Sequence, residues 1–420
     1  MVGGAFSVHR PSDRRSNRRD VRYRSTREEP RVPFRLAHVV SHPIQYQAPL
    51  LRRLAQEPGL ALKTFFLTDA GAQPFHDPGF NRVVQWDVPL LDGYDHQFIA
   101  RGLTLPLKFN QPARCSWRRV FATGGFDAVW VNGYAHGPLL RAIAAAKWLG
   151  IKVLVRGESH DGLRRKEPHW RRAAQRALFR QVDAFLAIGS ANRDFYLARG
   201  AAPERVHMAP YSVDNDYFRD RITAAASRRA ALLTELQLSP SLPIVLFASK
   251  LQPRKRCGDL LRAYETIRAH TRAQIVVVGD GSDRADLMEY VRARHLDEVR
   301  FVGFKNQSEL PAYYDLCDVF VLPSDVEPWG LVVNEVMNAG KPVVVSDAVG
   351  AARDLVPDGR SGRVFPVGDV AALATHLRAL IAQPHLRRRL GANARALVAR
   401  WGIDATVAGI RSALHALSPA

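Results

Sequence analysis

Two glutamates, Glu327 and Glu335, stand eight positions apart in this 420-residue chain. Between them, Gly330 allows the backbone to come close to a ligand just where a helix is predicted to begin. The free N–H groups of Gly330, Leu331 and Val332 would suit a phosphate. Because carboxylates repel phosphate, we expect the two glutamates to accept hydrogen bonds from hydroxyl groups instead. Hydroxyls on both sides of a diphosphate describe a nucleotide sugar.

The neighbouring residues predict the elements that position this pair. An apolar run at 319–322 predicts a strand, the helix follows Gly330 and ends near Gly340, and residues 343–345 predict the next strand. A strand–helix–strand unit of this kind builds a parallel sheet, whose ligand crevice lies at the carboxyl ends of the strands. Glu327 is therefore predicted to face that crevice.

This block resembles the E-x7-E region of the retaining glycosyltransferases of family 4. The likeness rests on DVFVLPS at 318–324, EPWGLVVNE at 327–335 and GKPV at 340–343. The resemblance implies a GT-B fold, in which Glu327 orients the donor sugar and Glu335 accepts hydrogen bonds from ribose. It implies no metal site and no cofactor, the nucleotide-diphosphate sugar being a co-substrate. The alternative is an ordinary strand–helix–strand unit with surface glutamates.

Further donor-side candidates follow two other predicted strands. Lys250 and Lys255 lie in the loop after the strand 244–248, where the family binds the donor diphosphate. Lys250 stands where the family has arginine. It keeps the positive charge but lacks the guanidinium group, which can donate two parallel hydrogen bonds. Gly303 and Phe304 end the strand 299–302, where the family holds the nucleotide base.

The acceptor-side candidates lie in the first half of the chain. His42, Gln45 and Tyr46 fill the loop after the strand 36–40, where family members often carry a glycine pair that is absent here. His136 lies in the loop after the strand 126–131.

A second catalytic candidate is His160, which follows the strand 151–155. With Asp161 it matches the His-Asp pair that the family places near the donor sugar. The expectation is an imidazole that hydrogen-bonds a sugar oxygen and is held by the neighbouring acid.

The sequence predicts an α/β protein with two doubly wound, Rossmann-like domains facing across a cleft. The expected divisions are a disordered basic arm (1–33), an acceptor-side domain (34–212), a polar linker (213–243), a nucleotide-sugar domain (244–395) and a terminal helix that crosses back to the first domain (396–420). The segment from residue 68 to Arg101 has no pattern that assigns it to a helix or a strand.

The net charge of +20 favours anionic partners, which include nucleic acid, acidic lipid head groups and phosphorylated substrates. No nucleic-acid-binding motif is present, so no specific nucleic acid is expected. Cys115, Cys257 and Cys317 have no metal-binding spacing and fit a reducing cytosol. No run approaches the ~18 apolar residues of a membrane span. The expected location is the cytoplasm, with peripheral contact to the inner face of the cell membrane as an option.

A basic amphipathic helix is predicted near residues 170–180. Its apolar stripe consists of Trp170, Ala173, Ala174, Ala177 and Leu178, and arginines flank it. Such a helix either lies on an anionic membrane surface or packs its stripe on the sheet.

Taken together, the resemblance implies a retaining transfer of a sugar to a glycan, a lipid-linked molecule or a small hydroxyl acceptor, as in the synthesis of cell-surface polysaccharides or glycoconjugates. Two alternatives stay open. One is a nucleotide-sugar 2-epimerase of the same fold, and the other is a non-catalytic protein that binds nucleic acid or membranes through its charge.

Overall fold

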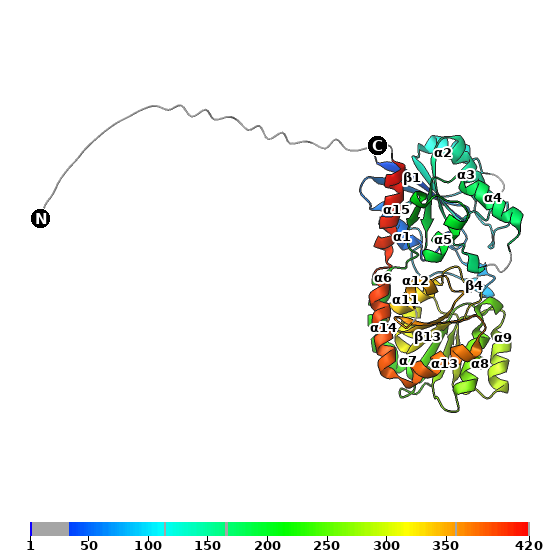
Figure 1. The fold of residues 1–420 in the computed structure, drawn as a ribbon, viewed down its shortest axis with the longest axis vertical. Coiled ribbons are helices and arrows are strands. Elements are labelled where there is room, and N and C mark those ends of the chain that lie inside the picture. Colours follow the sequence, from blue (N-terminus) through cyan, green and yellow to red (C-terminus); the bar gives the residue numbers. More distant parts are fainter. Residues whose placement is uncertain (2–32, 113–114, 164–166, 358, 419–420) are drawn as a thin grey trace. The chain divides into compact units, whose positions relative to one another are not determined.

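Two parallel β-sheets organise the protein in the computed structural model, which describes residues 1, 33–112, 115–163, 167–357 and 359–418. Residues 33–420 form one compact unit (Figure 1). The arm expected at 1–33 lies outside the described residues except at its two ends. No helix among the described residues is long and apolar enough to cross a bilayer.

The first sheet has seven parallel strands in the order β5-β2-β1-β6-β7-β8-β9. The strands are β1 (Phe34–Val40), β2 (Leu60–Phe66), β5 (Asp95–Phe98), β6 (Ala128–Asn132), β7 (Lys152–Arg156), β8 (Ala184–Ala187) and β9 (Val206–Met208). Its helices are α1 (Ala48–Ala55), α2 (Trp117–Gly124), α3 (Gly137–Trp148), α4 (His169–Phe179), α5 (Ser190–Ala198) and α15 (Ile403–Leu417).

Helices cover both faces of this sheet because successive residues of a strand point to opposite sides. Leu36 and Val40 of β1 pack in the core with α1 and α15, whereas Ala37 and Val39 pack with α2, α3 and α5. The doubly wound arrangement expected from the sequence is therefore confirmed.

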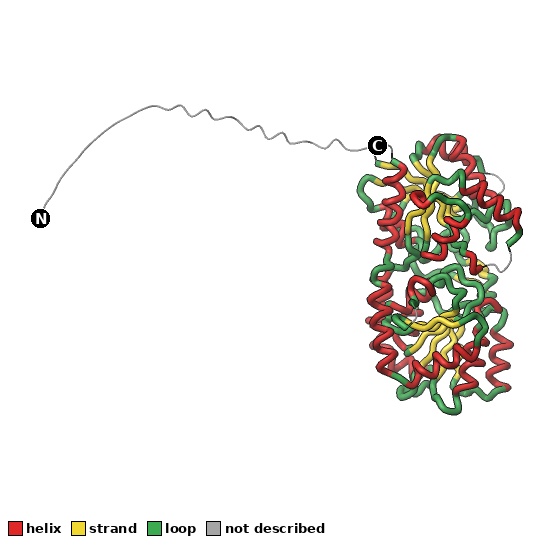
Figure 2. Tube along the Cα trace, in the orientation of Figure 1, coloured by secondary structure: helices red, strands yellow, loops and turns green. Residues whose placement is uncertain are grey.

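The second sheet has six parallel strands in the order β12-β11-β10-β13-β14-β15. The strands are β10 (Ile244–Ala248), β11 (Gln274–Val278), β12 (Val299–Gly303), β13 (Val319–Leu322), β14 (Val343–Ser346) and β15 (Gly362–Phe365). Its helices are α6 (Asn215–Ala225), α7 (Arg229–Glu235), α8 (Cys257–Ile267), α9 (Arg284–Ala293), α10 (Leu310–Leu316), α11 (Leu331–Met337), α12 (Ala352–Leu355), α13 (Val370–Ala382) and α14 (Pro384–Val398). Figure 2 shows the strands of each sheet with helices on both sides.

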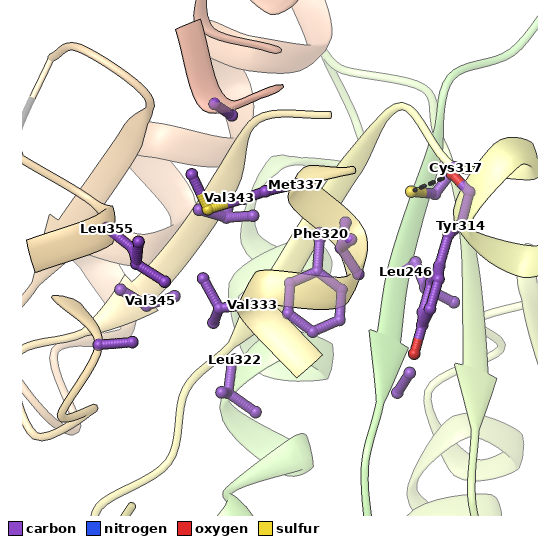
Figure 3. Close-up of a cluster of buried hydrophobic side chains, with 14 of the residues drawn as sticks. Leu246, Tyr314, Cys317, Phe320, Leu322, Val333, Met337, Val343, Val345 and Leu355 are labelled. Carbon is purple, nitrogen blue, oxygen red and sulfur yellow. Dashed lines mark hydrogen bonds between the residues drawn. The ribbon is translucent and has the colours of Figure 1, made fainter. Parts of the chain in front are cut away.

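The core beneath the predicted ligand-binding block is a cluster of buried apolar side chains. Val333 and Met337 of α11 contact the same apolar cluster as Phe320 and Leu322 of β13, and all four are fully buried (Figure 3). This packing fixes the short helix α11 on the sheet, which in turn fixes the loop that precedes it.

The segment 213–243 differs from the expected polar linker. It contains helices α6 and α7, and Phe218 and Ile222 of α6 are buried in the core of the second domain. Asp214 caps α6 by accepting a hydrogen bond from the N–H of Tyr217 at 3.0 Å. The polar residues cover the outer face of these helices, so the segment is part of the second domain.

The chain passes between the domains twice, at neighbouring places. Val213 pairs with Gly402 in an isolated parallel bridge, and the Asn215 side chain donates to the Val398 carbonyl at 3.0 Å. After the second passage, α15 packs on β8, β9 and α1 of the first domain. The predicted crossing of the last helix is thus confirmed.

Candidate functional site

A cavity of about 410 Å³ lies between the domains at the carboxyl ends of β1 and β10. Eleven of the residues selected from the sequence line it: His42, Gln45, Tyr46, Lys250, Lys255, Phe304, Glu327, Gly330, Leu331, Val332 and Glu335. Gly303 directly precedes Phe304 at the end of β12. His136 and His160 are outside this lining.

A buried ion pair forms part of the wall. The ammonium of Lys255 contacts the carboxylate of Glu327, and the two residues are 7% and 8% exposed. Burial lowers the pKa of Lys255, and the Glu327 carboxylate opposes that shift. The pair joins the loop after β10 to the loop after β13, so one positive and one negative group are held at a single point of the cavity.

Gly330 makes the turn from this loop into α11. Its φ of 94° is in the left-handed region, and a Cβ there would lie 3.1 Å from side-chain atoms of both Leu322 and Val349. Any other residue would be strained and crowded at this position. The turn brings the N–H groups at the start of α11 to the cavity, where Leu331 and Val332 form part of the lining.

Glu335 lies one helical turn further, on the same side of α11. Its carboxylate accepts a hydrogen bond from the Tyr314 hydroxyl at 2.5 Å. Burial raises the pKa of Glu335 to about 7, although the Tyr314 hydrogen bond opposes the shift. The carboxyl therefore titrates near neutral pH, and only its ionised form is a pure acceptor for hydroxyl groups.

Lys250 has a partner that the sequence did not suggest. Its ammonium contacts both carboxylate oxygens of Asp77, at 2.8 and 2.9 Å. Asp77 belongs to a small antiparallel hairpin of the first domain, β3 (Phe75–Asp77) and β4 (Arg82–Val84).

The loop after β1 supplies part of the first-domain wall of the cavity. The Ser41 hydroxyl and His42 Nδ1 are 2.9 Å apart, and burial lowers the pKa of His42 to about 4. His42 is therefore neutral at pH 7. Tyr46 meets Tyr211 edge to face, with ring centroids 5.6 Å apart, and burial raises the pKa of Tyr46 well above its ordinary value.

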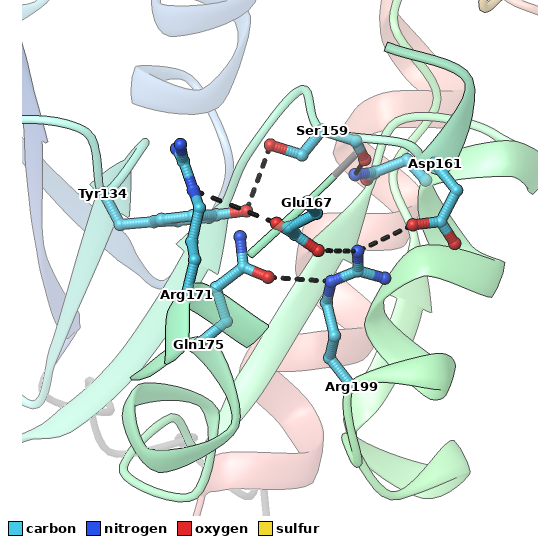
Figure 4. Close-up of polar contacts among 8 residues, drawn as sticks. Tyr134, Ser159, Asp161, Glu167, Arg171, Gln175 and Arg199 are labelled. Atoms are coloured by element: carbon cyan, nitrogen blue, oxygen red, sulfur yellow. Dashed lines mark hydrogen bonds and ion pairs between the residues drawn. The ribbon is translucent and has the colours of Figure 1, made fainter. Parts of the chain in front are cut away.

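His160 contacts the second domain, but the prediction that the neighbouring Asp161 holds its imidazole is wrong. Its Nε2 lies 3.3 Å from the backbone oxygen of Glu327, at hydrogen-bonding distance. The carboxylate of Asp161 instead accepts from Arg199 at 2.6 Å, and Arg199 also donates to Glu167 and Gln175 (Figure 4). This network fixes the loop after β7, and His160 is oriented by Glu327 rather than by Asp161.

His136 lies in a neighbouring cavity of about 290 Å³ that also contains Arg156 and Glu158. Glu158 is exposed to solvent, yet partial desolvation by the surrounding residues raises its pKa. Its carboxylate accepts from the Tyr211 hydroxyl at 2.5 Å. Among the residues that the structure describes, the buried Nδ1 of His136 and Nε of Arg156 have no hydrogen-bond partner. Several polar groups are thus available to a ligand with hydroxyls.

Sequence reasoning missed Glu158, Asp77 and three cavity aromatics, Phe75, Phe80 and Trp86. The position of Glu158 just after the strand ending at Arg156 was a usable signal. The other four lie in the segment that could not be assigned. Among the described residues, no three His, Cys, Asp or Glu side chains gather as a metal site.

Two family models match the chain. The model described as "Glycosyl transferases group 1" matches residues 232–397, and the "Glycosyl transferase 4-like domain" matches residues 43–212. Among curated relatives, the alpha-D-kanosaminyltransferase of Streptomyces kanamyceticus is 33% identical over 55% of this chain, and a D-inositol 3-phosphate glycosyltransferase of Streptomyces bingchenggensis is 32% identical over 68%. These matches span 60% and 65% of the relatives' own lengths.

Solved structures resemble the whole fold. A glycosyltransferase of Rickettsia africae has a TM-score of 0.71 at 14% identity and covers 92% of this chain and 100% of its own. An Anabaena protein in complex with UDP has a TM-score of 0.68 at 17% identity, with 91% and 100% covered. At these identities the likeness establishes the fold alone, which is GT-B as the sequence resemblance implied.

The titration of Glu335 generates a pH-dependent prediction. If its ionised form accepts from ribose hydroxyls, the Kd of a bound nucleotide sugar should rise about fivefold to tenfold as pH falls from 8 to 6, because Glu335 takes up a proton near pH 7. Isothermal titration calorimetry with a nucleotide sugar measures this directly. The Glu335→Gln variant should show a flat profile. A flat profile in the wild type, or the same slope in the variant, would contradict the role.

Proposed function

This chain belongs to the family 4 glycosyltransferases, and from that membership and the geometry of its cleft we propose that it transfers a sugar, with retention, from a nucleoside-diphosphate sugar to a hydroxyl acceptor. One observation carries the proposal: Glu327, Lys255, the Gly330 turn and Glu335 line a single interdomain cavity. The Anabaena neighbours with UDP and UDP-glucose support this class of donor.

On the donor side, the residues divide by charge. Glu335 accepts from the ribose hydroxyls, and Gly303 and Phe304 hold the base. Lys250, Lys255 and the N–H groups of Leu331 and Val332 hold the diphosphate and stabilise its charge as it leaves. These groups supply the positive charge that a metal would otherwise supply, so we propose a metal-independent reaction without further cofactors.

In the reaction, the bond between the anomeric carbon and the diphosphate oxygen breaks, and a bond to the acceptor oxygen forms on the same face of the sugar. The acceptor proton passes to the departing phosphate oxygen. Glu327 orients the donor sugar and stabilises the positive charge that develops on it. His160 hydrogen-bonds a sugar oxygen from the opposite domain, fixed through its contact with the Glu327 backbone.

The acceptor is a glycan, a lipid-linked molecule or a small hydroxyl compound that binds on the first-domain side. His42, Gln45 and Tyr46 face the donor cavity, and His136 lies in the adjoining cavity with Glu158. For such acceptors we propose a role in the synthesis of cell-surface polysaccharides or glycoconjugates. A 2-epimerase would use the same donor without an acceptor and would release only epimerised donor.

The role of Glu327 is testable by an isosteric change. A donor is first found by thermal-shift screening against UDP-, GDP-, ADP- and TDP-sugars. Glu327→Gln should then lower kcat by about 10²–10³-fold, because the charge that stabilises the transition state is lost. The Kd for the matching nucleoside diphosphate should not rise, because the Lys255 ammonium that pairs with Glu327 stays available to the diphosphate. Nucleotide release measured with purified protein gives kcat, and isothermal titration calorimetry gives the Kd.

Glu289→Gln is the matched control, since Glu289 is an exposed residue of α9 that pairs with Arg292. It should leave kcat unchanged. Full turnover in Glu327→Gln would contradict the assignment.

The helix α4 supports the further proposal of contact with an anionic membrane surface. The alternative that its stripe packs on the sheet is wrong for most of the stripe: Trp170 is 73% exposed, and Ala173, Ala174 and Ala177 are also exposed. The helix is anchored instead by Phe179, which is 2% exposed. An exposed indole flanked by arginines suits an interface with acidic lipids.

Liposome sedimentation tests this contact. Wild-type protein should bind vesicles of phosphatidylcholine with phosphatidylglycerol better than vesicles of phosphatidylcholine alone. Trp170→Ser should lower binding to the anionic vesicles by about fivefold, because less apolar surface enters the interface. Met288→Ser, on α9 of the second domain, is the control for an exposed apolar residue. Equal binding to both vesicle types would contradict the proposal.

A further inference from the structure

The hairpin β3–β4 is carried by the first domain but makes its contacts on the donor side of the second. It lies in the chain between β2 and β5, and within the described part of the chain its two strands pair with each other and with no other strand. Phe75, Asp77 and Phe80 line the interdomain cavity together with Lys250 and Phe304. None of the hairpin residues has a role in the proposed reaction so far.

Asp77 is held rigidly by its own turn. One carboxylate oxygen accepts the N–H groups of Gly79 at 2.7 Å and Phe80 at 3.1 Å. Asp77 is 8% exposed, so its charge is largely removed from water. The same carboxylate holds the Lys250 ammonium at 2.8 and 2.9 Å. Lys250 is thus paired to an anion that cannot easily move away.

Residues of the hairpin pack closely around the Lys250 side chain. The Lys250 ammonium lies 4.7 Å from the centre of the Phe80 ring, and a Cβ at Gly79 would lie 2.6 Å from Lys250 Cδ. The Phe80 ring meets Phe304 edge to face at 4.8 Å, and the Arg82 guanidinium lies 5.0 Å from the Phe304 ring. The residue expected at the diphosphate and the residue expected at the base are therefore both covered by one hairpin.

Residues that follow β4 also bind the hairpin to the second domain. The Asn306 side chain donates to the Gln85 carbonyl at 2.6 Å, and the Ser308 N–H donates to the Asp87 carboxylate at 3.2 Å. These contacts hold the hairpin on the second domain independently of Asp77. A change at Asp77 can therefore alter the charge beside Lys250 while the hairpin stays in place.

We propose that Asp77 competes with the donor diphosphate for Lys250, so that the hairpin sets the affinity of the cleft for nucleotides. The inference rests on the proposed function, because it takes Lys250 as a diphosphate-binding residue. A diphosphate that approaches Lys250 meets a fixed, desolvated carboxylate of its own sign, and like charges in such a site repel strongly. The hairpin thereby weakens product binding and favours release of the nucleoside diphosphate after transfer.

The test removes only the charge. Asp77→Asn keeps the oxygen that accepts from Gly79 and Phe80 and loses the repulsion. It should bind a nucleoside diphosphate about fivefold to tenfold more tightly than the wild type in isothermal titration calorimetry with UDP, GDP, ADP and TDP. Asp92→Asn removes the charge of an exposed first-domain residue outside the hairpin, and as the matched control it should leave the Kd within about twofold.

The outcomes separate this inference from the proposed function. Tighter nucleotide binding by Asp77→Asn, with the Kd of the control variant unchanged, supports the competition between Asp77 and the diphosphate. Unchanged or weaker binding by Asp77→Asn, with a wild type that binds, overturns the competition and leaves the donor site intact. If the wild type binds none of the four nucleotides, the proposed donor site fails and the competition fails with it.

Discussion

The pairing of Lys255 with Glu327 is the interaction on which the cleft depends. Taking either charge out of water alone is costly, and the contact between them offsets that cost only while both loops keep their positions. Lys255 is fixed by the turn after β10 and Glu327 by the strand end of β13, so the pair ties two neighbouring strand ends together. The result is a charged point held in place before any ligand arrives, as electrostatic catalysis requires.

The two domains contribute unequally to this site. The second domain supplies the acidic pair, the glycine turn and both lysines, from the loops after β10 and β13 and from helix α11. The first domain supplies groups that reach across: His160 contacts the Glu327 backbone, and Asp77 holds Lys250. Both contacts cross the cleft, so the arrangement of the domains and the state of the donor site are coupled.

The parts of the fold that sequence predicts well are those with a local signal. The buried strands β10 and β13 were predicted with their observed bounds, because uninterrupted apolar runs leave little alternative. Helix α6 was missed because only Phe218 and Ile222 mark its buried face. The hairpin β3–β4 was not predicted, because its strands have only three residues each. Its contacts are with Lys250 and Phe304, more than 170 residues away in the sequence. Likewise, Asp161 pairs with Arg199, a partner that no local pattern indicates.

Hydrogen exchange with and without a saturating nucleoside diphosphate tests the central claim most directly, namely that one interdomain cavity holds the diphosphate between the Gly330 turn and the lysine loop. We expect slowed amide exchange in the peptides that cover 328–334 and 249–256, with little change on the outer helices α9 and α13. Saturated binding that protects neither peptide, or that protects a surface away from the cavity, would contradict the account.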